Sequence, residues 1–293
     1  MTPVPISILI LTRNEEQDLP ACLASVAWSD DVHVFDSEST DRTAEIARAA
    51  GAHVTARAFD TYAAQRNAAL TTLPFKHDWI FILDADERPT PSLAREMEVA
   101  IASSPEGVAA YKVQRRDFLW NTWLKHAQLS PYYIRLVRRG HARYVRAVNE
   151  ALEVDGAIGQ LTAPLDHYPF SKGISHWVAK HNVYSTMEAQ LLASGAATAD
   201  ASLRTALLDR DFHRRRTAQK AIFYSLPGRS LVKWFYMMFV RGAILDGTAG
   251  VTYATLQSFY EYLIEVKRKE LQQKDREQGL GIRDQGYGSG SGS

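Results

Sequence analysis

The chain has 293 residues, which is enough for one large domain or for a catalytic domain with an appended region. Its 46% hydrophobic and 23% charged residues are typical of a folded globular protein, and a net charge of +1 excludes the strongly basic surface of a non-specific nucleic-acid binder. The single cysteine, Cys22, excludes an internal disulfide framework and a cysteine-based zinc site, and it suits a reducing compartment. The chain begins without a basic region or a cleavage site, so we expect no signal peptide.

The N-terminal part alternates apolar runs with helical patterns. The predicted strands are 6–11, 32–35, 52–56 and 79–83, and the predicted helices end near residue 26 or span about 44–50 and 62–70. Strands that alternate with helices indicate βαβ units. The sequence therefore predicts an α/β fold with a mostly parallel sheet.

The strand predicted from Trp79 ends in an acidic sequence, Asp84-Ala85-Asp86-Glu87. Side chains at i and i+2 of an extended chain point the same way, so Asp84 and Asp86 are expected to project together from its carboxyl end. Ligands of open α/β sheets bind at that end, and hard divalent cations prefer oxygen ligands. The alternative is that Asp84 caps the next helix and Asp86 is merely solvated.

Polar residues also follow two other predicted strands, as Thr12-Arg13-Asn14 and as Asp36. Parallel strands place their carboxyl ends at one edge of the sheet, so these groups should converge with Asp84 and Asp86. Helix capping explains one such cluster well but three converging clusters poorly, which favours a binding site.

Beyond residue 90 the pattern becomes mixed. Helices are predicted over about 91–103 and 174–194, and extended segments over 109–116, 134–138 and 144–154. Residues 120–126 (WNTWLKH) form an aromatic and basic loop that could cover a site, or else their tryptophans belong to the core.

The C-terminal third combines basic and aromatic residues. The apolar run 234–240 has about seven residues, far fewer than the roughly 20 that a transmembrane helix needs. Aromatic helices flanked by Lys and Arg can lie at the interface of an anionic membrane. The alternative is a helical appendage that packs on the catalytic domain or forms a homo-oligomer. Residues 286–293 (GYGSGSGS) look like an engineered flexible linker.

Four ordered motifs resemble the family-two inverting glycosyltransferases. They are residues 8–16 (ILILTRNEE), 35–43 (FDSESTDRT), 65–69 (QRNAA) and 83–87 (LDADE). More narrowly, residues 135–138 (RLVR), 149–150 (NE), 166–168 (DHY) and 245–250 (LDGTAG) are similar to the bacterial lipopolysaccharide inner-core glucosyltransferase branch. The resemblance extends to about Lys269.

The resemblance implies a GT-A fold, a UDP-sugar donor and a bound Mg²⁺ or Mn²⁺ ion. It places Thr12, Arg13, Asn14, Glu15 and Asp36 around the nucleoside, with Asp36 accepting a hydrogen bond from the uracil ring. The remaining implied residues are Arg66 near the base or pyrophosphate, Asp84 at the ribose and metal, Asp86 on the metal, and His167 as a further metal or phosphate contact. A lone histidine is more often structural, so that reading stays open for His167.

Direct displacement with inversion needs one general base to take the proton of the acceptor hydroxyl. The resemblance points to Glu150 for this role, with a surface ion pair as the alternative. The branch usually has histidine where this chain has Asn149, which puts a histidine-assisted mechanism in doubt.

These observations predict a catalytic domain over 1–170, a helical region over 171–275 and a flexible tail over 276–293. The expected enzyme transfers a hexose, glucose or another, from a UDP-sugar to a lipopolysaccharide-core, lipid-linked or other cell-envelope acceptor. It is expected to be cytoplasmic and peripheral on the inner face of the bacterial cytoplasmic membrane. Two alternatives are a polyprenyl-phosphate glycosyltransferase and a non-catalytic sugar-nucleotide-binding protein. A third, a sugar-1-phosphate nucleotidyltransferase, would have a glycine-rich loop after the first strand, where this chain has Thr12-Arg13-Asn14-Glu15 and no glycine.

Overall fold

The computed structural model describes residues 3–145, 151–194, 202, 205 and 212–285. The chain divides into two compact units, Met1–Lys172 and Gly173–Ser293, where the sequence suggested a boundary after residue 170. Each unit is described by itself below.

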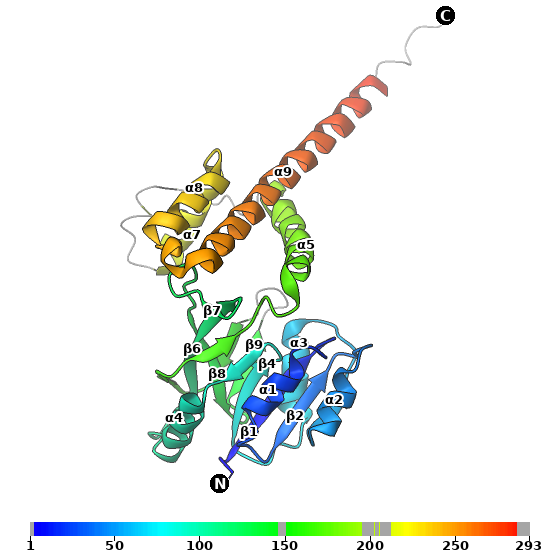
Figure 1. Cartoon of the computed structure of the whole chain (residues 1–293). Coiled ribbons are helices and arrows are strands. Elements are labelled where there is room, and N and C mark those ends of the chain that lie inside the picture. Colours follow the sequence, from blue (N-terminus) through cyan, green and yellow to red (C-terminus); the bar gives the residue numbers. More distant parts are fainter. Residues whose placement is uncertain (1–2, 146–150, 195–201, 203–204, 206–211, 286–293) are drawn as a thin grey trace, which may run out of the picture. The chain divides into compact units, whose positions relative to one another are not determined.

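The first unit is built on one mixed sheet (Figure 1). In the described residues its strand order is β3-β2-β1-β4-β8-β6-β12-β5, with β7 and β11 also paired to β6. The strands are β1 (Ile6–Thr12), β2 (Val32–Asp36), β3 (His53–Ala56), β4 (Trp79–Asp84), β5 (Glu87–Pro89), β6 (Val108–Leu119), β7 (Thr122–Trp123), β8 (Tyr132–Arg138), β11 (Ala157–Gln160) and β12 (Leu165–His167). The parallel order β3-β2-β1-β4 confirms the predicted βαβ units.

Strand β4 shows why the continuous apolar runs form the centre of this sheet. Phe81 and Leu83 face one hydrophobic cluster, and Ile80 and Ile82 face another on the opposite side. Helices α1 (Leu19–Ser25), α2 (Thr43–Ala49) and α4 (Pro91–Ala102) contribute to the first cluster, and α3 (Tyr62–Thr72) contributes to the second. A strand covered on both faces must be apolar throughout, as the sequence of β4 is.

The second half of the sheet departs from a simple parallel arrangement. Strand β8 runs antiparallel to both neighbours, β4 and β6. The segment 144–154, predicted as one extended stretch, instead contributes to two antiparallel strands, β9 (Ala142–Val145) and β10 (Ala151–Val154). The prediction of an extended chain is confirmed at 144–145 and 151–154, but these residues belong to two paired strands rather than one, and 146–150 lie outside the described residues.

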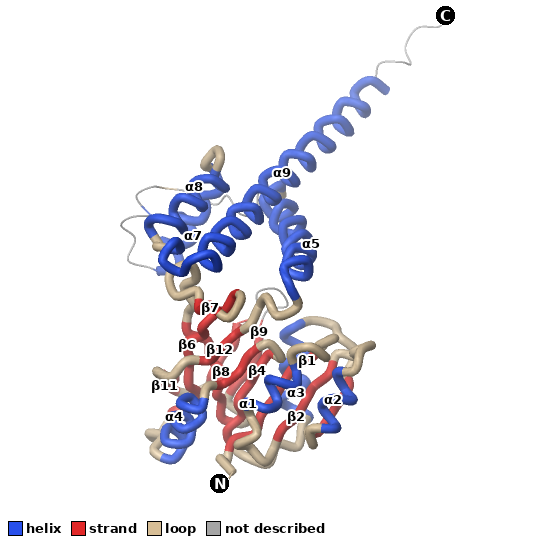
Figure 2. The backbone as a smooth tube through the Cα atoms, in the orientation of Figure 1, coloured by secondary structure: helices blue, strands red, loops and turns tan. Residues whose placement is uncertain are grey.

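The second unit is helical in its described residues (Figure 2). Its helices are α5 (Gly173–Ala193), α7 (Phe212–Ser225), α8 (Arg229–Phe235), the π-helix η1 (Tyr236–Val240), the 3-10 helix η2 (Ala243–Asp246) and α9 (Gly247–Gln285). Helix α5 packs on α9 through the apolar cluster of Ala189, Leu192 and Ile264. Helix α8 packs on α9 through Glu261, which contacts Arg229 at 3.4 Å and Lys233 at 3.0 Å.

The end of α9 corrects one expectation. Residues 276–285, predicted to belong to a flexible tail, continue the helix, which is rich in the good helix formers Lys, Arg, Glu and Gln. The linker-like residues 286–293 lie outside the described residues. Within the described part of the chain, no helix is both long enough and apolar enough to cross a membrane.

Candidate active site

The segments that follow β1 and β2 are joined through Asp36. The Thr12 hydroxyl donates a 2.7 Å hydrogen bond to Asp36 Oδ1, so the carboxyl ends of β1 and β2 meet as predicted. Ser39 donates to the same carboxylate twice, from its hydroxyl at 2.6 Å and its backbone N–H at 2.8 Å. Asp36 is 3% exposed, so these three hydrogen bonds fix its carboxylate firmly between the two loops.

Asn14 links the same two loops by its backbone. It adopts a left-handed conformation with φ 56°, which asparagine tolerates better than most residues. Its N–H donates to Ser39 Oγ at 2.8 Å, and its side-chain oxygen accepts from the Thr40 N–H at 2.8 Å. These contacts position the segment that carries Arg13, whose guanidinium lies 5.5 Å from the Phe59 ring centroid.

Glu15 is held by Lys172, a residue distant in sequence. The Lys172 ammonium lies 2.8 Å from Glu15 Oε1 and donates to the Asn14 carbonyl at 2.9 Å. Burial raises the pKa of Glu15 to about 7, although the Lys172 hydrogen bond acts in the opposite direction. The Glu15 side chain is 21% exposed, so Lys172 holds it against the loop after β1 rather than in open solvent.

Asp84 ends β4 between two arginines. Its carboxylate contacts Arg66 at 3.1 Å and Arg135 at 3.0 Å. Burial alone would raise the pKa of Asp84, but the two guanidinium groups hold that pKa well below its usual range. Asp84 is therefore an ionised carboxylate, and its side chain stays 35% exposed. It does not cap a helix, because Thr90 caps α4.

Asp86 is held by a different partner, His167. The His167 ring contacts Asp86 Oδ2 at 3.2 Å through Nε2 and Asp117 Oδ1 at 2.5 Å through Nδ1. Burial alone would lower the pKa of His167, but the bonds to Asp117 and Asp86 outweigh it and raise that pKa to about 9. In this geometry Nε2 of His167 faces Asp86, so coordination of a metal by His167 would require its contact with Asp86 to break.

Two buried residues that were given no role from the sequence fix this arrangement. Arg135 contacts Glu87 Oε1 at 2.5 Å as well as Asp84, and Glu87 accepts the Asp84 N–H at 3.1 Å. Burial raises the pKa of Glu87, while Arg135 acts against that shift. Both residues stand in quoted motifs, and a lone arginine in the apolar run Ile134–Val137 was the signal that could have identified Arg135.

The carboxylates of Asp84 and Asp86 could supply some, but not all, of the ligands of a hard divalent cation. In the residues that the structure describes, no group of three or more His, Cys, Asp or Glu side chains is arranged to hold a metal ion. Mg²⁺ is commonly bound by one or two carboxylates together with substrate phosphates and water. Asp84 and Asp86 fit that pattern, in which a diphosphate completes the coordination.

The structure thus brings together Thr12, Asn14 and Asp36, joins Arg66 to Asp84, and joins Asp86 to His167. The predicted base, Glu150, and its neighbour Asn149 lie outside the described residues. Their position relative to the carboxylates therefore stays a prediction from the sequence.

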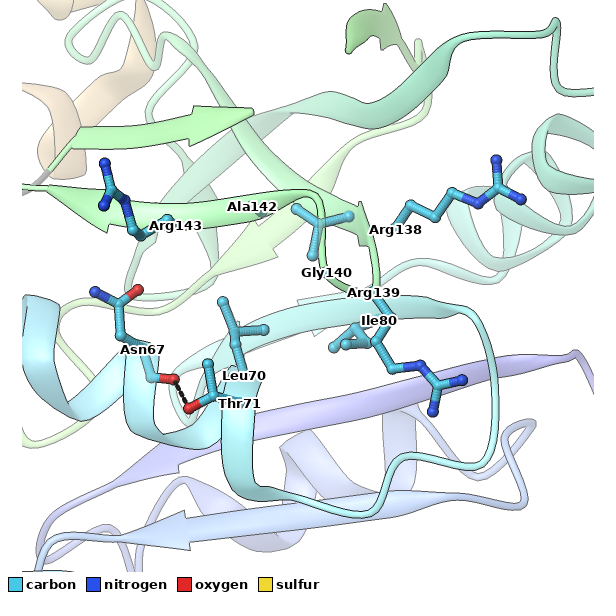
Figure 3. Close-up of a pocket in the computed structure, with 10 residues that line it drawn as sticks. Asn67, Leu70, Thr71, Ile80, Arg138, Arg139, Gly140, Ala142 and Arg143 are labelled. Carbon is cyan, nitrogen blue, oxygen red and sulfur yellow. Dashed lines mark hydrogen bonds between the residues drawn. The ribbon is translucent and has the colours of Figure 1, made fainter. Parts of the chain in front are cut away.

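A hollow of about 310 Å³ elsewhere in this unit is separate from the carboxylates (Figure 3). It lies between α3 and the turn after β8, where Ile80 and Val137 pair near the start of β4. Asp84 lies four residues further along, about 13 Å at the usual rise of a strand. Arg138, Arg139 and Arg143 direct their guanidinium groups away from the hollow. It therefore lacks the converging polar groups of a binding site.

Comparison with known proteins shows to which family this chain is related. The family model described as glycosyl transferase family 2 matches residues 7–159. An uncharacterized glycosyltransferase of Rickettsia bellii is 28% identical over 91% of this chain and 86% of its own length. The lipopolysaccharide core biosynthesis glycosyltransferase LpsC of Rhizobium meliloti is 30% identical over 66% of this chain and 73% of its own.

Among solved structures, glucosyl-3-phosphoglycerate synthase from Mycobacterium tuberculosis, in complex with Mn²⁺, UDP and glucosyl-3-phosphoglycerate, matches with a TM-score of 0.33 and 23% identity. The match covers 38% of this chain and 44% of the solved chain, so this chain spans less than half of that protein.

Proposed function

We propose that this protein transfers a hexose from a UDP-sugar, with inversion, to a cell-envelope glycan. The chain belongs to glycosyl transferase family 2 and is therefore a glycosyltransferase. A lipopolysaccharide-core acceptor is favoured because the relative LpsC is named for core biosynthesis. A lipid-linked acceptor, as used by polyprenyl-phosphate glycosyltransferases, is the nearest alternative.

The observation that carries this proposal is the convergence of two sets of groups at one sheet edge. The Thr12–Asp36–Ser39 cluster, with Arg13, Asn14 and Glu15 beside it, would bind the nucleoside. The ends of β1 and β4 are adjacent because these strands pair in parallel, with Leu11 opposite Asp84. A nucleoside diphosphate placed across this edge would set its phosphates near Asp84, Asp86 and Arg66.

Asp84 and Asp86 would hold Mg²⁺ or Mn²⁺ together with the diphosphate, and His167 stays a predicted further contact. Such an ion neutralises the negative charge that grows on the leaving diphosphate. Arg66 and Arg135 keep Asp84 ionised and oriented, and His167 orients Asp86 through its 3.2 Å contact. Glu150 would take the proton from the acceptor hydroxyl.

Calorimetry with UDP tests the donor site directly. We expect Mn²⁺ to increase the affinity of the protein for UDP at least tenfold, and Asp86→Asn to remove most of that increase, because an amide is a weaker ligand for a hard cation than a carboxylate. Asp78→Asn is the matched control, since Asp78 is an exposed carboxylate just before β4. UDP binding that does not depend on a metal in the unmodified protein would contradict the proposal.

The second unit carries a face suited to a lipid surface. Six large apolar residues are exposed along α8 and η1. They form three adjacent pairs spaced four residues apart, which are Leu231 and Val232, Phe235 and Tyr236, and Phe239 and Val240. Residues 212–245 contain seven Lys or Arg and no Asp or Glu, which favours contact with anionic headgroups, although Arg229 and Lys233 are already paired with Glu261 of α9. We place the enzyme peripherally on the inner face of the bacterial cytoplasmic membrane, by this apolar face.

Co-sedimentation with vesicles tests the membrane proposal. Burying one large apolar side chain contributes about 1.5–3 kcal/mol, so replacing two of them, as Phe239→Ser with Val240→Ser, should weaken binding to anionic vesicles by about 10²–10⁴-fold. Val99→Ser is the control, because Val99 is exposed on α4 in the first unit. If the unmodified protein does not sediment with vesicles but forms a dimer that these changes dissociate, the face is a contact between copies instead.

A further inference from the structure

The hairpin between β6 and β7 holds an aromatic residue in an unfavourable backbone conformation. Its two turn residues, Trp120 and Asn121, both adopt positive φ angles, 49° and 59°. Two-residue hairpin turns of this kind favour Asn-Gly, and a bulky residue with positive φ is unusual. The Trp120 side chain is 59% exposed, so core packing does not explain its presence. Such a residue is a candidate for a functional contact.

Phe118 and Trp123 lie on the two strands of the same hairpin and Tyr168 follows β12, and we call these three residues together with Trp120 the aromatic platform. The Phe118 and Tyr168 rings stack with centroids 5.2 Å apart. The Arg116 guanidinium lies 5.7 Å from the Phe118 ring and 5.5 Å from the Trp123 ring. Asp166 anchors Arg116 at 2.6 Å. Trp123 is 41% exposed, so the expectation that these tryptophans might belong to the core was wrong.

The platform continues directly from the carboxylate site. His167 pairs with Asp117 across β12 and β6, and the next residues on the two strands are Tyr168 and Phe118. The Tyr168 N–H donates to the Asp86 carbonyl at 2.9 Å. A ligand on these rings would therefore lie beside Asp86, on the side away from the Thr12–Asp36 cluster that is proposed to bind the nucleoside.

Two features of the platform define the chemistry of its ligand. The carbon–hydrogen faces of a sugar ring are apolar, and the exposed rings of Trp120 and Trp123 offer them a rigid surface with little loss of side-chain entropy. Phe118, Tyr168 and Arg88 stack on one another as support. Lys125 is exposed, lies 5.8 Å from the Trp123 ring and makes no salt bridge to any described residue. It can meet a phosphate or carboxylate on that sugar.

We propose that the aromatic platform is the acceptor subsite and binds a saccharide that carries an anionic group. This inference rests on the proposed function, since only a glycosyltransferase needs a sugar at this position. The platform binds the acceptor ring by stacking, and Lys125 selects acceptors with a phosphate or carboxylate. Trp120 is exposed for this contact rather than buried for stability.

Binding of core oligosaccharide, released from bacterial lipopolysaccharide by mild acid, tests the platform by calorimetry with UDP and Mn²⁺ present. Trp120→Asn and Trp123→Ala should each weaken this binding at least tenfold, and Trp120→Tyr should retain most of it. Asparagine accepts a positive φ more readily than tryptophan, so Trp120→Asn should fold with an equal or higher melting temperature. Val99→Ala, an exposed apolar residue of α4, is the control and should change nothing.

A second arm tests the anionic group. Lys125→Gln should weaken binding of the phosphorylated oligosaccharide several-fold and leave binding of the dephosphorylated form unchanged. If the unmodified protein binds neither form, or if Trp120→Asn and Trp123→Ala bind as tightly as it does, the platform is not the acceptor subsite. Failure of the unmodified protein to bind UDP with Mn²⁺ would contradict the proposed function instead, so the two failures are distinguishable.

Discussion

Replacing Arg135 with methionine should lower the free energy of unfolding by about 3–5 kcal/mol, the range found when one partner of a buried ion pair is removed. Arg135 lies between Asp84 at 3.0 Å and Glu87 at 2.5 Å, and Glu87 is fully buried. Methionine fills much of the arginine volume but leaves both carboxyl groups without this cation. Urea unfolding monitored by circular dichroism measures the effect.

Two further variants separate the ion pair from a general effect of the substitution. Arg143→Met should change stability by less than about 0.5 kcal/mol, because Arg143 is 73% exposed and its ion pair with Glu153, at 3.3 Å, lies at the surface. Glu87→Gln should cost less stability in the Arg135→Met background than alone, since the two residues contact each other. Equal costs in both backgrounds would show that Arg135 and Glu87 do not stabilise each other.

Glu150→Gln should reduce the rate of sugar transfer by about 10²–10⁴, the usual contribution of a general base. Glutamine keeps the size of the side chain but cannot accept the proton of the acceptor hydroxyl. The affinity for UDP in the presence of Mn²⁺ should stay within about twofold, because the proposed role of Glu150 concerns only the acceptor. Steady-state UDP release, with core oligosaccharide as acceptor, gives the rate.

Glu153→Gln is the control for this change. Glu153 lies on the neighbouring strand β10, is exposed and contacts Arg143 at 3.3 Å, so its loss should leave transfer unchanged. A Glu150→Gln protein with full turnover would remove Glu150 from the role of base. The search would then turn to other carboxylates near the aromatic platform.

Much of the fold could be predicted because its signals are local. The apolar runs that end at Thr12 and Asp84 identified β1 and β4, and the alternating helices predicted that these strands run parallel, whereas their direct pairing was seen only in the structure. The same runs placed Asp84 at a carboxyl end of the sheet, where the structure has it. Strands β5 and β12 were missed, because three residues are too few to show a period of two.

The charged contacts of the site could not be predicted, because they depend on strands that are distant in sequence. The antiparallel insertion of β8 between β4 and β6 brings Arg135 to Asp84, 51 residues away. The pairing of β12 with β6 brings His167 to Asp117, 50 residues away. No local pattern specifies which arginine or histidine will meet which carboxylate.

The sequence by itself determined the family, the parallel half of the sheet and the acidic residues at its carboxyl edge, since each follows from ordered motifs or from continuous apolar runs. Only the tertiary structure decided that Asp84 is held by two arginines, that His167 contacts Asp86, and that Trp120 is exposed. Those outcomes depend on strand order and register, which set the neighbours and the charge environment of each side chain.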